Sequence, residues 1–344
     1  MAEIKKTADS CVLYGVPKVH FGRVVDGEEQ NSFFPMCLQA VLNYMGQNIS
    51  YAELMVYTGV AFRQRCAIDG WNVAAIDCRN IYERHLEAFE RGFQGAGRSY
   101  KISEDINNPK KIIKQDALAL IKEELDCGRP VIALGVVGPP EPCIITGYRN
   151  NGETLLGWSL FQEWCCEEFD ESGYFVKHNW WQDTQAIMTI GEEVGRRTSD
   201  KEVLKNGLML MTTEEMAAYD GKDLFYGGYK AYEEWARLLE SGNFSDDAAD
   251  AHGDLQGMLG GRIFAAKYLK IVAKKHPQAE AELLECAKLL EQVAACDNKI
   301  WQARSRYNDL FEKALRKEMT TIIREAANIE KQACALLKQA IDIL

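Results

Sequence analysis

The hydrophobic pattern of this chain changes twice along its length, and each change marks a change in the predicted secondary structure. Apolar residues first recur at helical spacing, within residues 35–46, 51–57, 71–93 and 110–127. Short apolar runs bounded by turn residues follow, at 131–137, 143–148, 154–158, 173–177 and 186–190. Helical spacing returns after about residue 210. The pattern therefore predicts helices, then a sheet, then helices again.

Capping and turn residues support the boundaries of these elements. Pro35 and Gly46 bracket the first helical pattern, and Ser50-Tyr-Ala-Glu53 has the spacing of a capping box that opens the next helix. Asn150-Asn-Gly152 separates two apolar runs and is a strong hairpin signal. Because short strands follow one another closely, we predict an antiparallel meander within an α+β domain over residues 1–195.

The C-terminal part, residues 196–344, is predicted to be an all-α helical bundle. One aromatic-rich helix is expected over residues 222–240, and Pro277 opens another. Near-heptad apolar stripes then run through Ile300, Ala303, Tyr307, Leu310 and Ala314, and through Ile322, Ala326, Ile329, Ala333, Leu336, Ala340 and Ile343. Such stripes fit packing within one up-and-down bundle or the interface of a homodimer, and packing within one bundle is the more common arrangement.

Composition narrows the class of protein. The 47% hydrophobic and 26% charged fractions of the 344 residues are those of a globular protein, and the net charge of -11 argues against nucleic acid as the main partner. The eleven cysteines are odd in number and contain no Cys-x-x-Cys motif, which favours reduced thiols and a cytoplasmic protein. The N-terminus lacks an apolar signal core, and no stretch reaches the roughly 18 apolar residues of a membrane helix, so no membrane partner is expected.

Cys37 is the strongest candidate for chemistry in the sequence. Following Pro35, it is predicted to lie in the first turn of a helix. Unsatisfied amide groups and a partial positive charge at a helix N-terminus favour a thiolate over a thiol, which makes such a cysteine a candidate nucleophile. The alternative role is that of a small buried hydrophobic residue.

A cysteine helix followed by further helices and then a meander containing Ile144-Ile-Thr-Gly-Tyr148 resembles the papain-like cysteine peptidase fold. Over residues 10–190 the chain looks most like the butirosin biosynthesis protein H N-terminal family and the bacteriocin-processing peptidases, and its helical tail is similar to that of the butirosin-type family. The resemblance implies that Cys37 is the nucleophile. It also implies that Asn31 takes the place of the glutamine that helps to form the oxyanion hole.

The same resemblance reveals two altered catalytic positions. Glu141 stands where the family has its catalytic histidine, and Ser159 is the polar residue nearest to the place of the orienting Asn or Asp. A carboxylate with a pKa of about 4.3 is a poor base for a thiol of about 8.5, since the proton transfer costs about 5 to 6 kcal/mol. Among the histidines, His178 is expected at the opposite end of the meander, whereas His20 remains as an alternative partner for the thiol.

Several further residues are candidates for ligand contact. Cys143 lies two residues after Glu141 and points to the same face, so it either lines the cleft or fills the core. Trp158 and Ser159 lie at the predicted cleft end of their strand. The segment 159–170 is rich in aromatic and acidic residues, and forms either a rim that favours cationic ligands or an ordinary solvated loop. Its adjacent cysteines lack further ligands at metal spacing, so neither a metal nor another cofactor is assigned.

Two hypotheses of function follow. In the first, the protein is a thiol enzyme that resembles the butirosin-type acyltransferases and uses Cys37 for acyl transfer to, or hydrolysis of, a small amide, ester or thioester. In the second, it is a catalytically degenerate cysteine-peptidase-like protein that binds a small molecule or peptide, with cationic ligands favoured, in the former active-site cleft. General peptidase activity is the least favoured, because that reaction class relies on imidazole activation.

Overall fold

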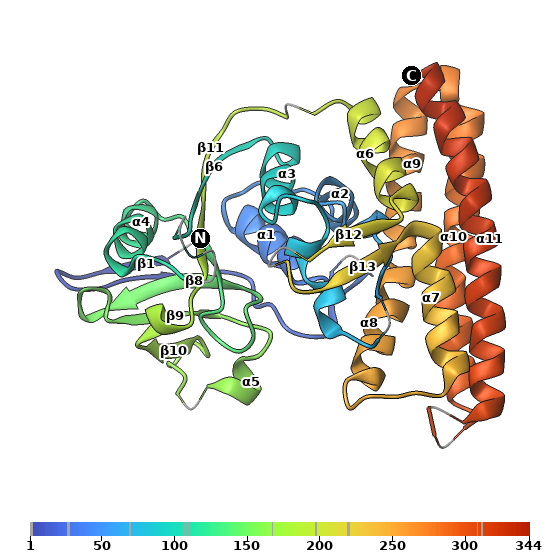
Figure 1. The fold of residues 1–344 in the computed structure, drawn as a ribbon. Helices are drawn as coiled ribbons and strands as arrows, with labels where there is room; N and C mark the ends of the chain where they lie inside the picture. Colours follow the sequence, from blue (N-terminus) through green and yellow to red (C-terminus); the bar gives the residue numbers. More distant parts are fainter. Residues whose placement is uncertain are drawn as a thin grey trace. The chain divides into compact units, whose positions relative to one another are not determined.

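The structure, a computed structural model, describes residues 3–25, 28–68, 70–105, 108, 111–166, 168–196, 198–218, 221–307, 309–310 and 312–344. It is a mixed α+β protein with antiparallel sheets and a C-terminal helical region (Figure 1). Within the described ranges, no helix combines the length and the apolar character needed to cross a membrane.

The chain forms two compact units that are not simply consecutive. The first unit consists of Met1–Leu54 and Gly92–Arg197, and the second consists of Met55–Arg91 and Thr198–Leu344. The chain enters the second unit for the last time at Thr198, close to the domain boundary predicted near residue 195. The segment 55–91, however, belongs with the helical second unit instead of the first.

One large antiparallel sheet organises the first unit. Its strands follow the order β1-β2-β8-β7-β11-β6, while β9 pairs with β8 and β10 pairs with β9. The strands are β1 (Glu3–Lys6), β2 (Cys11–Tyr14), β6 (Arg98–Ser103), β7 (Val131–Leu134), β8 (Pro142–Arg149), β9 (Thr154–Trp158), β10 (Phe175–His178) and β11 (Ala186–Glu193). A separate hairpin joins β3 (Arg23–Val25) to β4 (Glu28–Gln30). All five strands predicted between residues 131 and 190 are confirmed.

The predicted meander is only partly correct. Strands β8, β9 and β10 follow one another as expected, and the hairpin between β8 and β9 turns at Asn150 and Asn151, both with positive φ. Strand β7 instead pairs with both β8 and β11, and β11 continues the sheet to β6. The strands β1, β2 and β6 lie outside the predicted sheet, because the apolar spacing in the first part of the chain predicts helices.

Helices cover the sheet of the first unit. Helix α1 (Phe33–Tyr44) packs against β7 and β8, whereas α4 (Lys114–Asp126) packs against β2, β7, β8 and β11. The two helices lie on opposite sides of these strands in Figure 1, which explains why β7 is buried along its whole length. A short helix, α5 (Gln162–Cys165), follows β9.

Two helices contain the points where the chain passes between the units. These are α2 (Tyr51–Tyr57) and α3 (Glu87–Gly95). The capping box predicted for α2 is confirmed, since the Glu53 amide donates to Ser50 Oγ at 3.3 Å and the Ser50 amide donates to Glu53 Oε2 at 3.3 Å.

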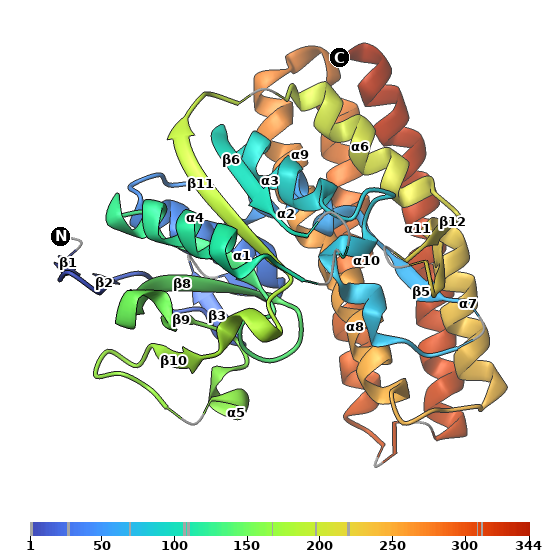
Figure 2. The same cartoon turned by 60° about the vertical axis from the view of Figure 1, so that its left-hand side comes forward.

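The second unit is a set of long helices with a small sheet at its side. Its helices are α6 (Asp200–Thr212), α7 (Gly228–Ser241), α8 (Ala248–Gly260), α9 (Arg262–Lys275), α10 (Glu280–Arg304) and α11 (Lys313–Ile343). Figure 2 shows α7, α10 and α11 side by side, and α9 also packs on α10. The sheet has the order β12-β13-β5, from β12 (Glu215–Ala217), β13 (Leu224–Gly227) and β5 (Arg65–Ala67).

Several predictions for this unit are wrong. The helix expected over residues 222–240 begins only at Gly228, because residues 224–227 form β13. The stripe expected from Ile300 to Ala314 does not belong to one helix, because α10 ends at Arg304 and α11 begins at Lys313.

Residues 71–93 do not form one helix: Asn72 and Asp77 accept hydrogen bonds from nearby backbone amides, and these local bonds compete with a continuous helix. Two short 3-10 helices, Val73–Ile76 and Cys78–Asn80, form there instead. Further 3-10 helices elsewhere in the described chain are Val60–Phe62, Asn150–Gly152, Trp180–Gln182 and Pro277–Ala279. Strands also persist after residue 210, because β13 finds its partner β5 far away in the sequence.

Candidate functional site

Cys37 lies deeper in its helix than the sequence predicted. Helix α1 begins at Phe33, and the carbonyl of its N-cap residue Ser32 accepts the Met36 amide at 3.1 Å. Pro35 is therefore the third helical residue and Cys37 the fifth. The favourable effect of a helix N-terminus falls off within the first turn, so it stabilises a Cys37 thiolate less than expected.

The Cys37 thiol is buried against the start of β8. Its exposed fraction is 0%, and Sγ donates to the carbonyl oxygen of Pro142 at 3.6 Å. Pro142 directly follows Glu141, so Cys37 lies beside the backbone position that precedes β8, where the resemblance places the catalytic base. A sulfur that donates a hydrogen bond carries its proton, and this contact therefore favours the neutral thiol.

Glu141 lies in a tight loop between β7 and β8. It is half-buried, its amide donates to the Pro139 carbonyl at 2.6 Å, and its own carbonyl accepts the Gly135 amide at 3.3 Å. Gly135 has a φ of 79°, and a Cβ there would lie 2.7 Å from the Asp183 carbonyl oxygen. The loop backbone therefore requires glycine, and Glu141 directly precedes β8.

Asn31 and His20 have partners close to them in sequence. Both side chains are exposed. His20 Nδ1 lies 2.9 Å from the Phe21 carbonyl oxygen. When the Asn31 amide is oriented to satisfy its surroundings, its nitrogen donates to the Gln30 carbonyl at 3.2 Å and to Glu29 Oε1 at 3.3 Å. These contacts support neither the oxyanion role of Asn31 nor the base role of His20.

His178 is located where the strand directions predicted it. It pairs with Thr154 at the start of β9, and its Nδ1 lies 3.0 Å from Thr154 Oγ1. The cleft end of β9 is at Trp158, the other end of the strand. The predicted location of His178 at the far end of the sheet is confirmed.

Trp158 and Ser159 use their polar atoms to hold loops in place. Trp158 Nε1 donates to the Val16 carbonyl at 2.9 Å. Ser159 Oγ donates to the Val137 carbonyl at 3.4 Å and accepts the Phe161 amide at 3.1 Å. Both residues are buried, so their contacts indicate structural roles at the predicted cleft end.

Cys143 is part of the sheet core. It is fully buried, its Sγ donates to the Ala133 carbonyl at 3.4 Å, and burial raises the pKa of its thiol to about 12. Of the two roles considered for it, core filling fits these contacts. Cys143 and Cys37 thus make the same kind of bond, from a buried sulfur to a main-chain carbonyl.

Arg23 is a residue near the thiol that sequence analysis missed. Its buried side chain donates from Nη1 to Gln30 Oε1 at 3.0 Å, and Gln30 Nε2 donates to Gln39 Oε1, on α1, at 2.6 Å. Burial lowers the pKa of Arg23, while Cys37 and Tyr51 raise it electrostatically. A nearby guanidinium favours a thiolate, but it cannot accept the thiol proton. No spacing motif signals this contact, because the β3–β4 hairpin creates it.

Four aromatic side chains, here called the aromatic cluster, gather beside the start of α1. They are Phe21, Phe33, Phe161 and Trp164. The Phe21 ring centroid lies 5.7 Å from that of Phe33, 5.5 Å from that of Phe161 and 5.5 Å from that of Trp164. Phe33 is the first residue of α1, and Trp164 is 70% exposed.

The loop that leads to Glu141 also contacts this cluster. A Cβ on Gly138 would lie 2.7 Å from Phe161 Cβ, so the loop and the ring are in close contact. Lys18 lies at the same edge, with Nζ 3.2 Å from Glu163 Oε1 and 5.5 Å from the Trp158 ring centroid. An exposed apolar surface with charged neighbours therefore borders the loop of Glu141.

The described residues contain no group of three or more His, Cys, Asp or Glu side chains arranged to hold a metal ion.

None of the protein-family models compared with the chain matches it, and a search of curated proteins likewise found no match. No family assignment follows from these comparisons.

Proposed function

We propose that this protein is a catalytically degenerate cysteine-peptidase-like protein that binds a cationic small molecule or peptide at the aromatic cluster. One observation supports this most: the aromatic surface beside the start of α1 is exposed, whereas the thiol of Cys37, four residues after Phe33 on the same helix, is wholly buried. A nucleophile must reach its substrate, whereas a binding surface needs only exposed groups of suitable chemistry.

The contacts of Cys37 argue against nucleophilic catalysis. Its sulfur donates to a carbonyl, and its surroundings resemble those of the core residue Cys143. Glu141 is the residue at the expected base position, and a carboxylate receives a thiol proton only at a cost of about 5 to 6 kcal/mol. These features suit a structural thiol.

The aromatic cluster supplies the binding chemistry. The faces of Phe21 and Trp164 attract cations, and this attraction contributes about 0.5–1 kcal/mol at exposed sites and more when the cation is desolvated. The exposed Glu163 and Glu168 of the same segment lie beside Lys18 and His178, and the chain has a net charge of -11. The net charge favours a cationic ligand over an anionic one.

Alkylation of the thiols by iodoacetamide, resolved by site with mass spectrometry and followed against pH, tests the structural role of Cys37. Cys143 is the matched buried control, and the exposed Cys127 and Cys165 are the reactive references. We expect Cys37 to react slowly, at a rate close to that of Cys143. A Cys37 rate close to that of the exposed thiols, already high well below pH of about 8.5, would contradict the proposal.

Fluorescence-detected binding of a lysine-rich peptide and a glutamate-rich peptide of equal length tests the surface. We expect the lysine-rich peptide to bind, and Trp164→Ala to weaken it about tenfold through loss of cation–π contact and apolar area. Trp301→Ala is the matched control, because Trp301 is also highly exposed but lies on α10 in the other unit. Equal loss in both variants, or preference for the acidic peptide, would refute the assignment.

Arg23 supports a second candidate, the thiol acyltransferase or hydrolase. Its electrostatic interaction with Cys37 would stabilise a thiolate once the sulfur is exposed by a local rearrangement. If Cys37 alkylates rapidly, Arg23→Met should slow that reaction, whereas Lys18→Met, at an exposed position of the same unit, should not. Unchanged alkylation in Arg23→Met would exclude this activation.

A further inference from the structure

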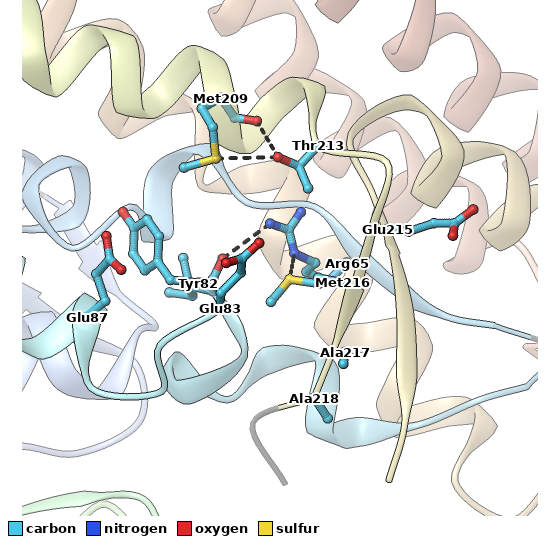
Figure 3. A pocket seen from close by; sticks show the side chains of 11 residues that line it. Arg65, Tyr82, Glu83, Glu87, Met209, Thr213, Glu215, Met216, Ala217 and Ala218 are labelled. Atoms are coloured by element: carbon cyan, nitrogen blue, oxygen red, sulfur yellow. Dashed lines mark hydrogen bonds between the residues drawn. The ribbon is translucent and has the colours of Figure 1, made fainter. Parts of the chain in front are cut away.

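The second unit contains a pocket of about 570 Å³ with a buried arginine in its wall. Strand β5 contributes Arg65, the segment before α3 contributes Tyr82 and Glu83, and the end of α6 and the following strand contribute Met209, Thr213 and Met216 (Figure 3). This volume lies in the range of small-molecule sites.

Among the described residues, Arg65 has only neutral hydrogen-bond acceptors. Its exposed fraction is 1%; Nε donates to Met216 Sδ at 2.8 Å, Nη1 donates to the Gln64 carbonyl at 3.0 Å, and Nη2 donates to the Ile81 carbonyl at 3.3 Å. Within the described ranges no carboxylate forms an ion pair with this guanidinium. A guanidinium has five N–H groups, so these three bonds leave donors for a further acceptor.

The guanidinium remains charged at neutral pH. Burial lowers the pKa of Arg65 to about 10, and the positive charge of Arg63 acts in the same direction. A buried charge without a counter-ion is strongly unfavourable, because neutral dipoles replace its hydration only in part. The pocket beside Arg65 is therefore a suitable place for an anion that completes the site.

The backbone leaves room for Arg65. Gly227 pairs with Arg65 across β13 and β5, and a Cβ at Gly227 would lie 2.3 Å from Arg65 Nη1 and 2.5 Å from the Thr213 carbonyl oxygen. Any side chain at Gly227 would displace the guanidinium. The strand pairing thus holds the arginine against the pocket.

The pocket also provides apolar walls. Met209 and Met216 line it, and the flexible thioether side chains adapt to ligands of different shape. Tyr82 is the aromatic part of the wall; its hydroxyl accepts a hydrogen bond from Asn206 Nδ2 at 2.6 Å, and burial raises its pKa to about 12. The tyrosine is therefore neutral and adds no negative charge beside Arg65.

Glu83 is the acidic residue most available to a ligand. Glu87 lies 2.7 Å from Arg91, and Glu215 lies 3.0 Å from Lys230. Among the described lining residues, Glu83 is the carboxylate outside such an ion pair, and it is exposed. The pocket thus presents a buried positive charge and an exposed negative charge to the same space.

We propose that this pocket binds a small zwitterion, with its carboxylate on Arg65, its ammonium group facing Glu83 and its aliphatic part between Met209 and Met216. A carboxylate matches the fork of a guanidinium, and such a charged pair is stronger than one between neutral groups. This site belongs to the second unit and does not depend on whether Cys37 reacts.

Calorimetric and thermal-shift titrations of the full chain test this assignment. The panel consists of glycine, 4-aminobutyrate, 6-aminohexanoate and leucine, together with hexanoate and hexylamine as analogues that lack one charge. We expect at least one zwitterion to bind at concentrations up to about 10 mM and to raise the melting temperature by a few degrees. Hexanoate should bind at least about fivefold more weakly than 6-aminohexanoate if the latter binds, and hexylamine should not bind.

Substitutions then locate the site. Arg65→Met should weaken the binding zwitterion at least about tenfold, and Glu83→Gln should weaken it but leave hexanoate unaffected. Arg63→Met is the matched control, since Arg63 is equally buried but does not line the pocket, and it should retain binding. The titrations of the natural chain test the proposal even if a variant fails to fold, because failure of every zwitterion to bind overturns it.

Three outcomes would overturn the proposal. These are failure of every zwitterion in the panel to bind the natural chain, retention of full affinity in folded Arg65→Met, and equal affinity for hexanoate and its amino derivative. None of them bears on the peptide surface or on Cys37 alkylation, so the two proposals fail separately.

Discussion

Two buried arginines of the second unit, Arg262 and Arg65, differ in how their charge is compensated. Arg262 is fully buried and binds Glu330 in a bidentate pair, with Nε–Oε2 at 2.6 Å and Nη2–Oε1 at 3.0 Å. Its Nη1 also donates to the carbonyls of Ala61 and Arg63. Arg65, in contrast, has two carbonyls and a thioether as acceptors.

The pKa values of the two side chains move in opposite directions. Burial alone would lower the pKa of Arg262, but the Glu330 carboxylate holds it above its ordinary value. Burial lowers that of Arg65, and no carboxylate of the described chain offsets this effect. Arg262 thus joins parts of the unit through an ion pair, whereas Arg65 lacks such a pair among the described residues and is the proposed contact for a ligand.

Breaking the compensated pair should give the largest change. Glu330→Gln leaves Arg262 buried without its counter-ion, and we expect a loss of about 3–5 kcal/mol in the free energy of unfolding, measured by urea denaturation. Glu325→Gln is the matched control on the same helix, because its pair with Lys299 is exposed and should contribute less than about 1 kcal/mol. Similar losses in both variants would contradict the structural role of the Arg262–Glu330 pair.

A third buried group, His252, is uncharged at neutral pH. We expect its effect on the free energy of unfolding to be intermediate in size. Trp235 Nε1 donates to His252 Nδ1 at 3.0 Å, and burial lowers the pKa of His252 to about 3. Because the folded-state pKa lies below the unfolded value of about 6.5, stability is complete above that value and falls as the pH drops toward 3. We expect a contribution of up to about 1.4 kcal/mol per pH unit in this window.

The pH dependence of His252 is measured by urea denaturation at several pH values between 7 and 4. His252→Gln should remove its part of the slope while keeping an acceptor for Trp235. His20→Gln, at an exposed histidine of the first unit, is the control and should leave the slope as it is. A slope that does not change in His252→Gln would show that His252 already titrates normally.

Removing the uncompensated charge should give the smallest change in stability. Arg65→Met keeps much of the side-chain volume and removes a desolvated cation, so we expect the free energy of unfolding to change by less than about 1 kcal/mol or to rise. The same denaturation measurement on Arg262→Met should show a loss of about 3–5 kcal/mol, since it leaves Glu330 unpaired. A large loss in Arg65→Met would mean that Arg65 has a structural role like that of Arg262.

The candidate sites show which residue positions local sequence patterns predict and which they do not. The position of Glu141 before β8 and that of His178 at the far end of β9 both followed from strand directions and local spacing. The depth of Cys37 in α1 did not, because Ser32 begins the helix before Pro35 and no residue pattern fixed that start. The thiol's burial depends on packing of α1 against β8, and spacing within one segment contains no information about such packing.

What the sequence determined by itself is local. The turn at 150–152, the capping box at Ser50 and the apolar stripe of α11 all arise from residues within a few positions of one another, whose conformational preferences do not need distant partners. Tertiary structure decided the rest. Arg65 reaches its pocket only because β5 pairs with β13, about 160 residues later. That no described carboxylate pairs with it is likewise seen only once both segments are folded together.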